Sequence, residues 1–203
     1  MRVIAGRARG RRLASVPGTG TRPITDRAKE ALFAVLRDVV PGARVLDLFA
    51  GTGSVGIEAL SRGAEHCTFV EESPLAVRTL RANLEHTGLA DGARVLRCDV
   101  FRLLHSGPVE GYDLVYVAPP QYHGLWRRTL LALDQAPGWV TDGGRVVVQI
   151  HPREVEAVPL RHLAEVDRRH YGSVLLWFYA SPDPTPPSDT ADPALGAGTT
   201  GTS

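Results

Sequence analysis

Apolar stretches with strand character alternate with stretches of helical apolar spacing along most of the chain. The apolar runs predict strands at 44–49, 66–70, 94–98, 112–117 and 144–150, and the helical patterns predict helices at 54–62, 74–87, 100–105 and 123–135. Such alternation predicts a parallel sheet with helices on both faces. Two further extended segments, 161–170 and 173–180, are separated by Gly172 and predict an antiparallel edge pair. We therefore expect an α/β, Rossmann-like fold with a seven-stranded, mostly parallel sheet.

The two ends of the chain differ from this repeating middle. Residues 1–16 alternate weakly and predict a glycine-bent hairpin, and Thr25 is the expected N-cap of a helix over 26–39. Residues 182–203 contain five prolines, many small polar residues and no basic residue, a composition typical of disordered segments. We therefore divide the chain into a basic N-terminal hairpin arm and loop at 1–24, a main domain at 25–181 and a disordered tail at 182–203.

The composition limits the class of protein. A chain of 203 residues with 43% hydrophobic content can bury one sizeable core. Its two cysteines, Cys67 and Cys98, show no metal-site spacing, so we expect a reducing compartment and no metal. No signal sequence or apolar run of membrane-spanning length is evident, and we expect a cytoplasmic protein without a membrane partner.

The net charge of +1 conceals an uneven distribution. Residues 1–30 hold eight basic and two acidic side chains, a net charge of +6, so the rest of the chain carries −5. A solvated charged segment would have the same composition, but here the basic residues alternate with glycine and small residues, which favours an extended arm that contacts a polyanion. The candidate nucleic-acid contacts are Arg7, Arg9, Arg11, Arg12, Arg22, Arg27 and Lys29.

A glycine-rich turn follows the first strand of the main domain. Gly51, Gly53 and Gly56 stand between that strand and the next predicted helix, where glycine lets backbone amides approach a ligand closely. Taken alone, this G-x-G-x-x-G spacing indicates a dinucleotide site. Asp47, near the carboxyl end of the strand, would repel a pyrophosphate and attract a ligand that carries an ammonium and a sulfonium group. The turn with its acid therefore predicts S-adenosylmethionine as the ligand.

Two more acids end the next two strands. Glu71 can accept both hydroxyls of a ribose, and Asp99, beside Val100 and Phe101, suits an adenine, whose amine donates and whose faces favour apolar contacts. Asp99 is also a candidate N-cap for the short helix that follows it. A nicotinamide site would leave Asp47 and Asp99 without a role. The candidate cofactor-binding residues are Asp47, Phe49, Gly51, Thr52, Gly53, Glu71, Asp99 and Val100.

The fourth strand runs into Ala118-Pro119-Pro120-Gln121-Tyr122, our candidate catalytic segment. Two prolines fix φ and remove backbone donors, so the preceding carbonyls are held rigidly. Acceptors that hold the protons of an exocyclic amine can direct its lone pair toward a methyl group. The aromatic ring of Tyr122 is suited to stacking on a base. A turn that caps the following helix would use the same prolines.

The chain resembles class I S-adenosylmethionine-dependent methyltransferases, and more narrowly the RsmD-type family. The most specific motifs are Arg2–Gly6 with Gly10-Arg11, Thr21–Phe33 and Asp47–Gly63, and the resemblance covers roughly residues 2–180. It implies a class I methyltransferase domain that methylates the exocyclic N2 amine of a guanine in 16S ribosomal RNA, free or within an assembling small subunit, as a monomer.

The resemblance further implies a role for each part of the site. Asp47 and the Gly51–Gly53 turn would hold the methionine part of the cofactor, Glu71 the ribose and Asp99 the adenine. The segment 118–122 would hold the target base, and methyl transfer would be a direct in-line displacement.

One position departs from the family pattern. The family begins its fourth-strand motif with Asp or Asn, followed by Pro-Pro and directly by an aromatic residue, whereas here Ala118 takes the first place and Gln121 precedes Tyr122. Either Gln121 and the backbone carbonyls replace the missing acceptor, or catalysis is weak, or the substrate differs. The alternatives are an S-adenosylmethionine-binding RNA-binding protein of ribosome assembly without activity, a methyltransferase for a protein or small molecule, and a nicotinamide oxidoreductase.

Overall fold

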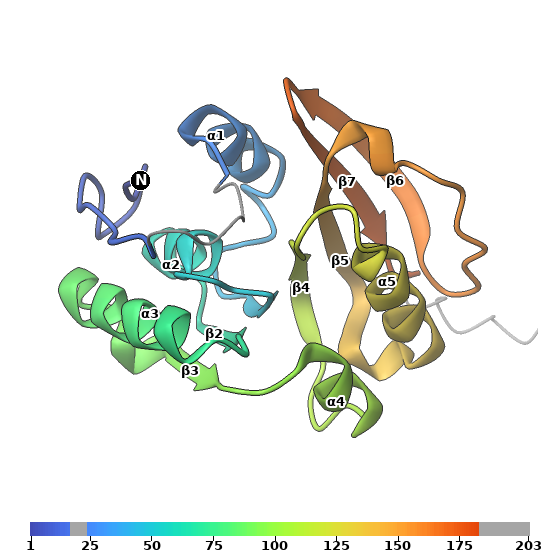
Figure 1. Cartoon of the computed structure of the whole chain (residues 1–203), viewed down its shortest axis with the longest axis horizontal. Helices are drawn as coiled ribbons and strands as arrows, with labels where there is room; N and C mark the ends of the chain where they lie inside the picture. Colours follow the sequence, from blue (N-terminus) through green and yellow to red (C-terminus); the bar gives the residue numbers. More distant parts are fainter. Residues whose placement is uncertain (17–23, 183–203) are drawn as a thin grey trace, which may run out of the picture.

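The computed structural model describes residues 1–16 and 24–182 and contains one seven-stranded sheet (Figure 1). Its order is β3-β2-β1-β4-β5-β7-β6. The first five strands in this order are parallel, whereas β7 pairs antiparallel with both β5 and β6. The predicted fold class is confirmed. The strands are β1 (Arg44–Leu48), β2 (His66–Val70), β3 (Ala93–Leu96), β4 (Tyr112–Val117), β5 (Val140–Ile150), β6 (Ala164–Tyr171) and β7 (Val174–Ala180).

Helices cover both faces of the sheet. Side chains of α1, α2 and α3 pack in one core cluster, and those of α4 and α5 pack in a second cluster on the opposite face. Figure 1 shows these two groups of helices on either side of the strands. The helices are α1 (Asp26–Val35), α2 (Ser54–Ser61), α3 (Pro74–Thr87), α4 (Val100–His105) and α5 (Leu125–Gln135), with short 3₁₀ turns at Ala90–Gly92, Pro137–Trp139 and Pro152–Glu154.

The two largest differences from the sequence-based prediction lie at the end of α1 and at the start of β5, and several other boundaries shift by one to three residues. The helix predicted over 26–39 ends at Val35, because its C-cap Leu36 leaves the helical backbone conformation, with φ −90° and ψ 11°, and a turn follows. The strand predicted at 144–150 begins at Val140. The glycines at 143 and 144 suggest a turn, but the strand continues across a register shift, and Val140 pairs with Tyr112.

The N-terminal segment, residues 1–16, forms the predicted hairpin, with an antiparallel bridge between Arg2 and Arg12. It packs against the body of the protein along α2. The Arg7 N–H donates to the Ser61 carbonyl at 2.8 Å, and a Cβ on Gly6, whose φ is +81°, would lie 1.8 Å from the same oxygen. Gly6 therefore permits a close approach that another residue would block. The segment lies flat on the domain.

No helix in the described ranges combines the length and apolar character needed to cross a bilayer.

Candidate active site

A cavity of about 530 Å³ opens at the carboxyl ends of β1, β2 and β4. Strand order reverses between β1 and β4, which is where open α/β sheets bind their ligands. The volume is in the range of small-molecule sites. We call it the strand-end cavity. Predicted site residues in its wall are Asp47, Phe49, Gly51, Thr52, Glu71, Asp99, Val100, Ala118 and Pro120, and other wall residues include Met1, Ile24, Ser54, Phe101, Tyr116, Leu125 and Gln149.

The turn between β1 and α2 has the backbone geometry that its glycines predicted. Gly51 and Gly53 adopt φ values of +56° and +82°, and Gly53 is the N-cap of α2. Gly53 does not line the cavity wall; a Cβ there would lie 2.2 Å from Leu80 Cδ1. Phe49 also has a positive φ, +61°, which is costly for an aromatic residue. The chain thus holds a strained turn at the floor of the cavity.

Asp47 is a buried acid at this turn, with 2% of its surface exposed. Its Oδ2 accepts the Gly56 N–H at 3.0 Å. Burial raises the pKa of Asp47 to about 7, and the neighbouring Glu71 carboxylate adds to the rise, whereas the hydrogen bond from Gly56 lowers it. Burial penalises the carboxylate, and a cation in the cavity would relieve that penalty. Asp47 is therefore poised to bind a positively charged group.

Glu71 and Asp99 lie in the same wall, and each is fixed by backbone donors. Glu71 Oε2 accepts the Gly51 N–H and Oε1 accepts the Ser73 N–H, both at 2.8 Å. Asp99 is the N-cap of α4 and accepts the Arg102 N–H at 2.8 Å. Each carboxylate oxygen has a further lone pair available for a ligand. The capping role and a ligand role are thus compatible.

The segment after β4 borders the cavity with only part of its length. Ala118 and Pro120 line the wall, whereas Pro119, Gln121 and Tyr122 do not. Tyr122 is 63% exposed and has a φ of +66°. Its N–H donates to Glu154 Oε1 at 2.8 Å, and its ring centroid lies 5.6 Å from that of His151. Tyr122 thus stands outside the cavity with its ring available to a large ligand.

Sequence reasoning missed several polar residues of the cavity wall, among them Tyr116 and Gln149. The hydroxyl of Tyr116 donates to Gln149 Oε1. One sequence signal could have revealed this pair: Gln149 is a polar residue near the end of an apolar strand. Because β5 runs parallel to β4, the carboxyl ends of the two strands lie at the same edge of the sheet. Phe101, which the sequence suggested as an apolar contact for an adenine beside Asp99, also lines the wall and packs edge-on against Phe49, with ring centroids 6.3 Å apart.

Most of the predicted nucleic-acid contacts lie on the surface. Within the described residues, Arg7, Arg9, Arg12 and Arg27 are exposed. Arg11 is exposed too, and its guanidinium donates to the His86 carbonyl at the end of α3. Arg22 lies outside the described residues.

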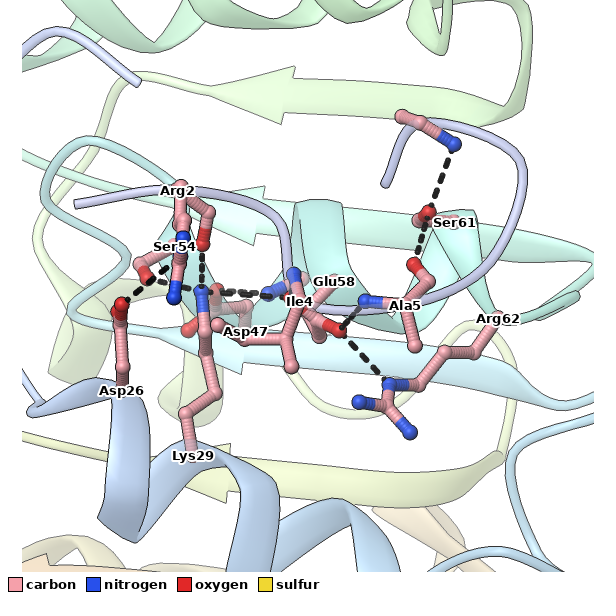
Figure 2. A network of polar contacts seen from close by, with 12 residues as sticks. Arg2, Ile4, Ala5, Asp26, Lys29, Asp47, Ser54, Glu58, Ser61 and Arg62 are labelled. Atoms are coloured by element: carbon pink, nitrogen blue, oxygen red, sulfur yellow. Dashed lines mark hydrogen bonds and ion pairs between the residues drawn. The ribbon is translucent and has the colours of Figure 1, made fainter. Parts of the chain in front are cut away.

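Lys29 is a correction to the predicted set. Its side chain is fully buried, and its ammonium lies 3.3 Å from Glu58 Oε2 in a salt bridge (Figure 2). The same ammonium donates to the Arg2 carbonyl at 2.6 Å and to Ser54 Oγ at 3.4 Å. Burial lowers the pKa of Lys29, although Glu58 opposes this change. Lys29 therefore joins the N-terminal segment, α1 and α2, and is not a free RNA contact.

Glu58 completes this buried network. Its carboxylate accepts the Ile4 and Ala5 N–H groups at 2.8 and 2.9 Å and pairs with Arg62 Nε at 2.8 Å. The assembled contacts hold residues 2–5 on α2, beside Ser54 of the cavity wall (Figure 2).

Comparisons with known proteins agree on one family. A family model described as "Conserved hypothetical protein 95" matches residues 1–180. "Putative rRNA methyltransferase YlbH" of Bacillus subtilis is 42% identical over 158 residues, 77% of this chain and 85% of the relative. "Ribosomal RNA small subunit methyltransferase D" of Escherichia coli K12 is 37% identical over 149 residues, 73% and 74% of the two chains. The solved structure "Putative methyltransferase yhhF" of Escherichia coli superposes with a TM-score of 0.79 at 32% identity and covers 91% of this chain and 99% of its own.

Proposed function

The chain belongs to the Conserved hypothetical protein 95 family, and from this premise we propose that it transfers the methyl group of S-adenosylmethionine to the exocyclic N2 amine of a guanine in 16S ribosomal RNA. The observation that carries the proposal is the set of Asp47, Glu71 and Asp99 around one cavity at the strand ends. The names of the relatives supply the substrate class, small-subunit ribosomal RNA.

The strand-end cavity fits this cofactor through its donor and acceptor groups. Asp47 meets the positive charge of the methionine part, and the Gly51–Gly53 turn lets the backbone approach it. Glu71 accepts the ribose hydroxyls, and Asp99 accepts the adenine amine beside the apolar Val100. Phe49 and Thr52 complete the cofactor wall. S-adenosylmethionine supplies an electrophilic methyl group on a sulfonium sulfur when it is bound.

The RNA approaches over the exposed arginines and the segment 118–122. Arg7, Arg9 and Arg12 of the N-terminal segment and Arg27 of α1 neutralise phosphates, and Arg11 adds its remaining donors. We include in this set Arg22, which lies outside the described residues. The same division into an N-terminal arm at 1–24, a methyltransferase domain at 25–181 and a tail at 182–203 is part of the proposal.

Methyl transfer requires the protein mainly to position the target amine against the methyl group. Pro119 and Pro120 hold the backbone at the cavity edge, and Tyr122 stacks on the extruded base. Acceptors around the amine direct its lone pair at the methyl carbon. We further propose that the protein acts in the cytoplasm as a monomer, on 16S ribosomal RNA that is free or within an assembling small subunit.

The test is methyl transfer from labelled S-adenosylmethionine by the purified protein to small subunits lacking guanine methylation. The expected product is N2-methylguanosine in 16S ribosomal RNA, and label in no nucleoside would contradict the proposal. Ala118, in the place of the family's acceptor, favours one other function, that of an RNA-binding protein without catalysis. That function predicts binding of both ligands with no transfer, and transfer after Ala118→Asp.

A further inference from the structure

Gln149 of β5 lies beside Ala118, the position at which the family carries an Asp or Asn acceptor. Val117 of β4 pairs with Val148 of β5, so the next residues along the two strands, Ala118 and Gln149, are neighbours across the strand pair. Both line the strand-end cavity. Gln121, the acceptor that the sequence suggests, is outside the cavity wall. A side-chain amide therefore faces the cavity beside the position that lost its acceptor.

The amide of Gln149 is held in a defined orientation. The Tyr116 hydroxyl donates to Gln149 Oε1. Tyr116 is 3% exposed, and burial raises the pKa of its phenol well above the ordinary value, with the Asp47 carboxylate adding to the rise. The phenol therefore stays protonated and acts as a donor, which keeps the amide oxygen pointing toward it. An amide oxygen has two lone pairs, so one is left for a second donor.

We propose that Gln149 is the side-chain acceptor for the target amine, in place of the Asp or Asn that the family carries at position 118. The inference rests on the proposed methyl transfer to a guanine amine and names the residue that positions that amine. Tyr116 is then a positioning residue, because it orients the Gln149 amide without touching the base.

The role is consistent with the chemistry of the step. Gln149 Oε1 accepts a hydrogen bond from the amine and turns the nitrogen lone pair toward the methyl carbon. The nitrogen–carbon bond forms as the carbon–sulfur bond breaks, the bonding pair stays on sulfur, and the proton that nitrogen loses passes to water. Gln149 takes no proton in this step, so the amide suffices without a carboxylate.

The experiment compares Gln149→Leu with wild type under single-turnover conditions on ribosomal RNA. Leucine keeps the size of the side chain and removes the acceptor. We expect the rate of methyl transfer to fall about 100-fold, with the affinity for S-adenosylmethionine unchanged, because only the amine loses its partner. Gln149→Glu keeps an acceptor and is expected to retain at least about a tenth of the rate. Gln135→Leu, at the exposed end of α5, is the matched control and should keep the wild-type rate.

A rescue variant separates positioning of the amine from a structural role. Adding Ala118→Asn to Gln149→Leu restores an acceptor across the strand pair and should recover most of the lost rate. If Gln149 only stabilised the fold, Ala118→Asn would not restore the rate of methyl transfer. A double variant that stays as slow as Gln149→Leu therefore contradicts the inference. An unchanged rate in Gln149→Leu overturns it too, whereas a loss of cofactor affinity in place of rate assigns Gln149 to the cofactor site. Wild type that methylates no ribosomal RNA contradicts the proposed function itself, so the two failures are distinct.

Discussion

Replacing Asp47 with asparagine should stabilise the free protein and weaken its cofactor binding. In the wild type the Gly56 N–H donates to Asp47 Oδ2 at 3.0 Å. Asparagine keeps an oxygen that can accept this hydrogen bond, but its side chain cannot ionise. In the wild type, burial raises the pKa of Asp47 from 3.8 to about 7. The folded state therefore holds the proton more tightly than the unfolded state, and this contribution to stability is full below pH 3.8 and lost as the pH rises to about 7.

The size of the effect follows from the two pKa values of Asp47. Each pH unit between them costs the folded wild type about 1.4 kcal/mol, so the whole interval amounts to roughly 4 kcal/mol. About 3 kcal/mol of that falls between pH 5 and pH 8. The free energy of unfolding of Asp47→Asn should therefore exceed that of wild type by an amount that grows by about 3 kcal/mol over this range.

The assay is urea unfolding of the cofactor-free protein at pH 5 and pH 8, for wild type, Asp47→Asn and Asp91→Asn. Asp91 is exposed, and its variant is expected to follow wild type at both pH values. Calorimetry should show that Asp47→Asn binds S-adenosylmethionine more weakly than wild type does. The wild type should bind it about tenfold more tightly at pH 8 than at pH 6, because only the ionised carboxylate attracts the cation. A stability difference that is constant or shrinks with rising pH would refute the reasoning.

Three further variants test other parts of the structure. Glu71→Ala removes the acceptor of the Gly51 N–H and a ribose contact, so calorimetry should show a dissociation constant for S-adenosylmethionine about tenfold higher or more. Changing Arg9, Arg11 and Arg12 together to alanine should lower the slope of log affinity for RNA against log salt by up to about three, with cofactor affinity unchanged; an unaltered slope would remove these residues from the RNA contacts. Lys29→Met removes one cationic partner of the buried Glu58 carboxylate, which keeps Arg62, and should cost about 2 kcal/mol in urea unfolding, whereas loss of an exposed RNA contact would cost almost nothing.

The sequence was sufficient for most of the fold because the relevant signals are local. β2, β4, α3 and α4 have the predicted bounds, and each has a clear apolar run or cap, such as Asp99 before α4. The end of α1 and the start of β5 could not be read from a local pattern. β5 extends through Gly143 and Gly144 because β4 offers it a partner across a register shift, and no local pattern reveals that partner.

The residues of the candidate site likewise differ in whether local sequence could reveal them. Asp47, Glu71 and Asp99 were predictable, since an acid at the end of a parallel strand must lie at the shared carboxyl edge. Lys29 was misassigned because its partner, Glu58, lies on another helix, and a lysine in a basic segment gives no sign of burial. Gln149 was missed because its role depends on the strand pairing that places it beside Ala118.

We propose that this protein methylates a guanine of 16S ribosomal RNA. The decisive measurement is mass analysis of 16S ribosomal RNA from cells that lack the protein, compared with cells that contain it. We predict that one guanine loses its N2-methyl group, and that the wild-type chain restores the methyl group whereas Gln149→Leu restores it slowly. Identical methylation of 16S ribosomal RNA in both strains would contradict the claim.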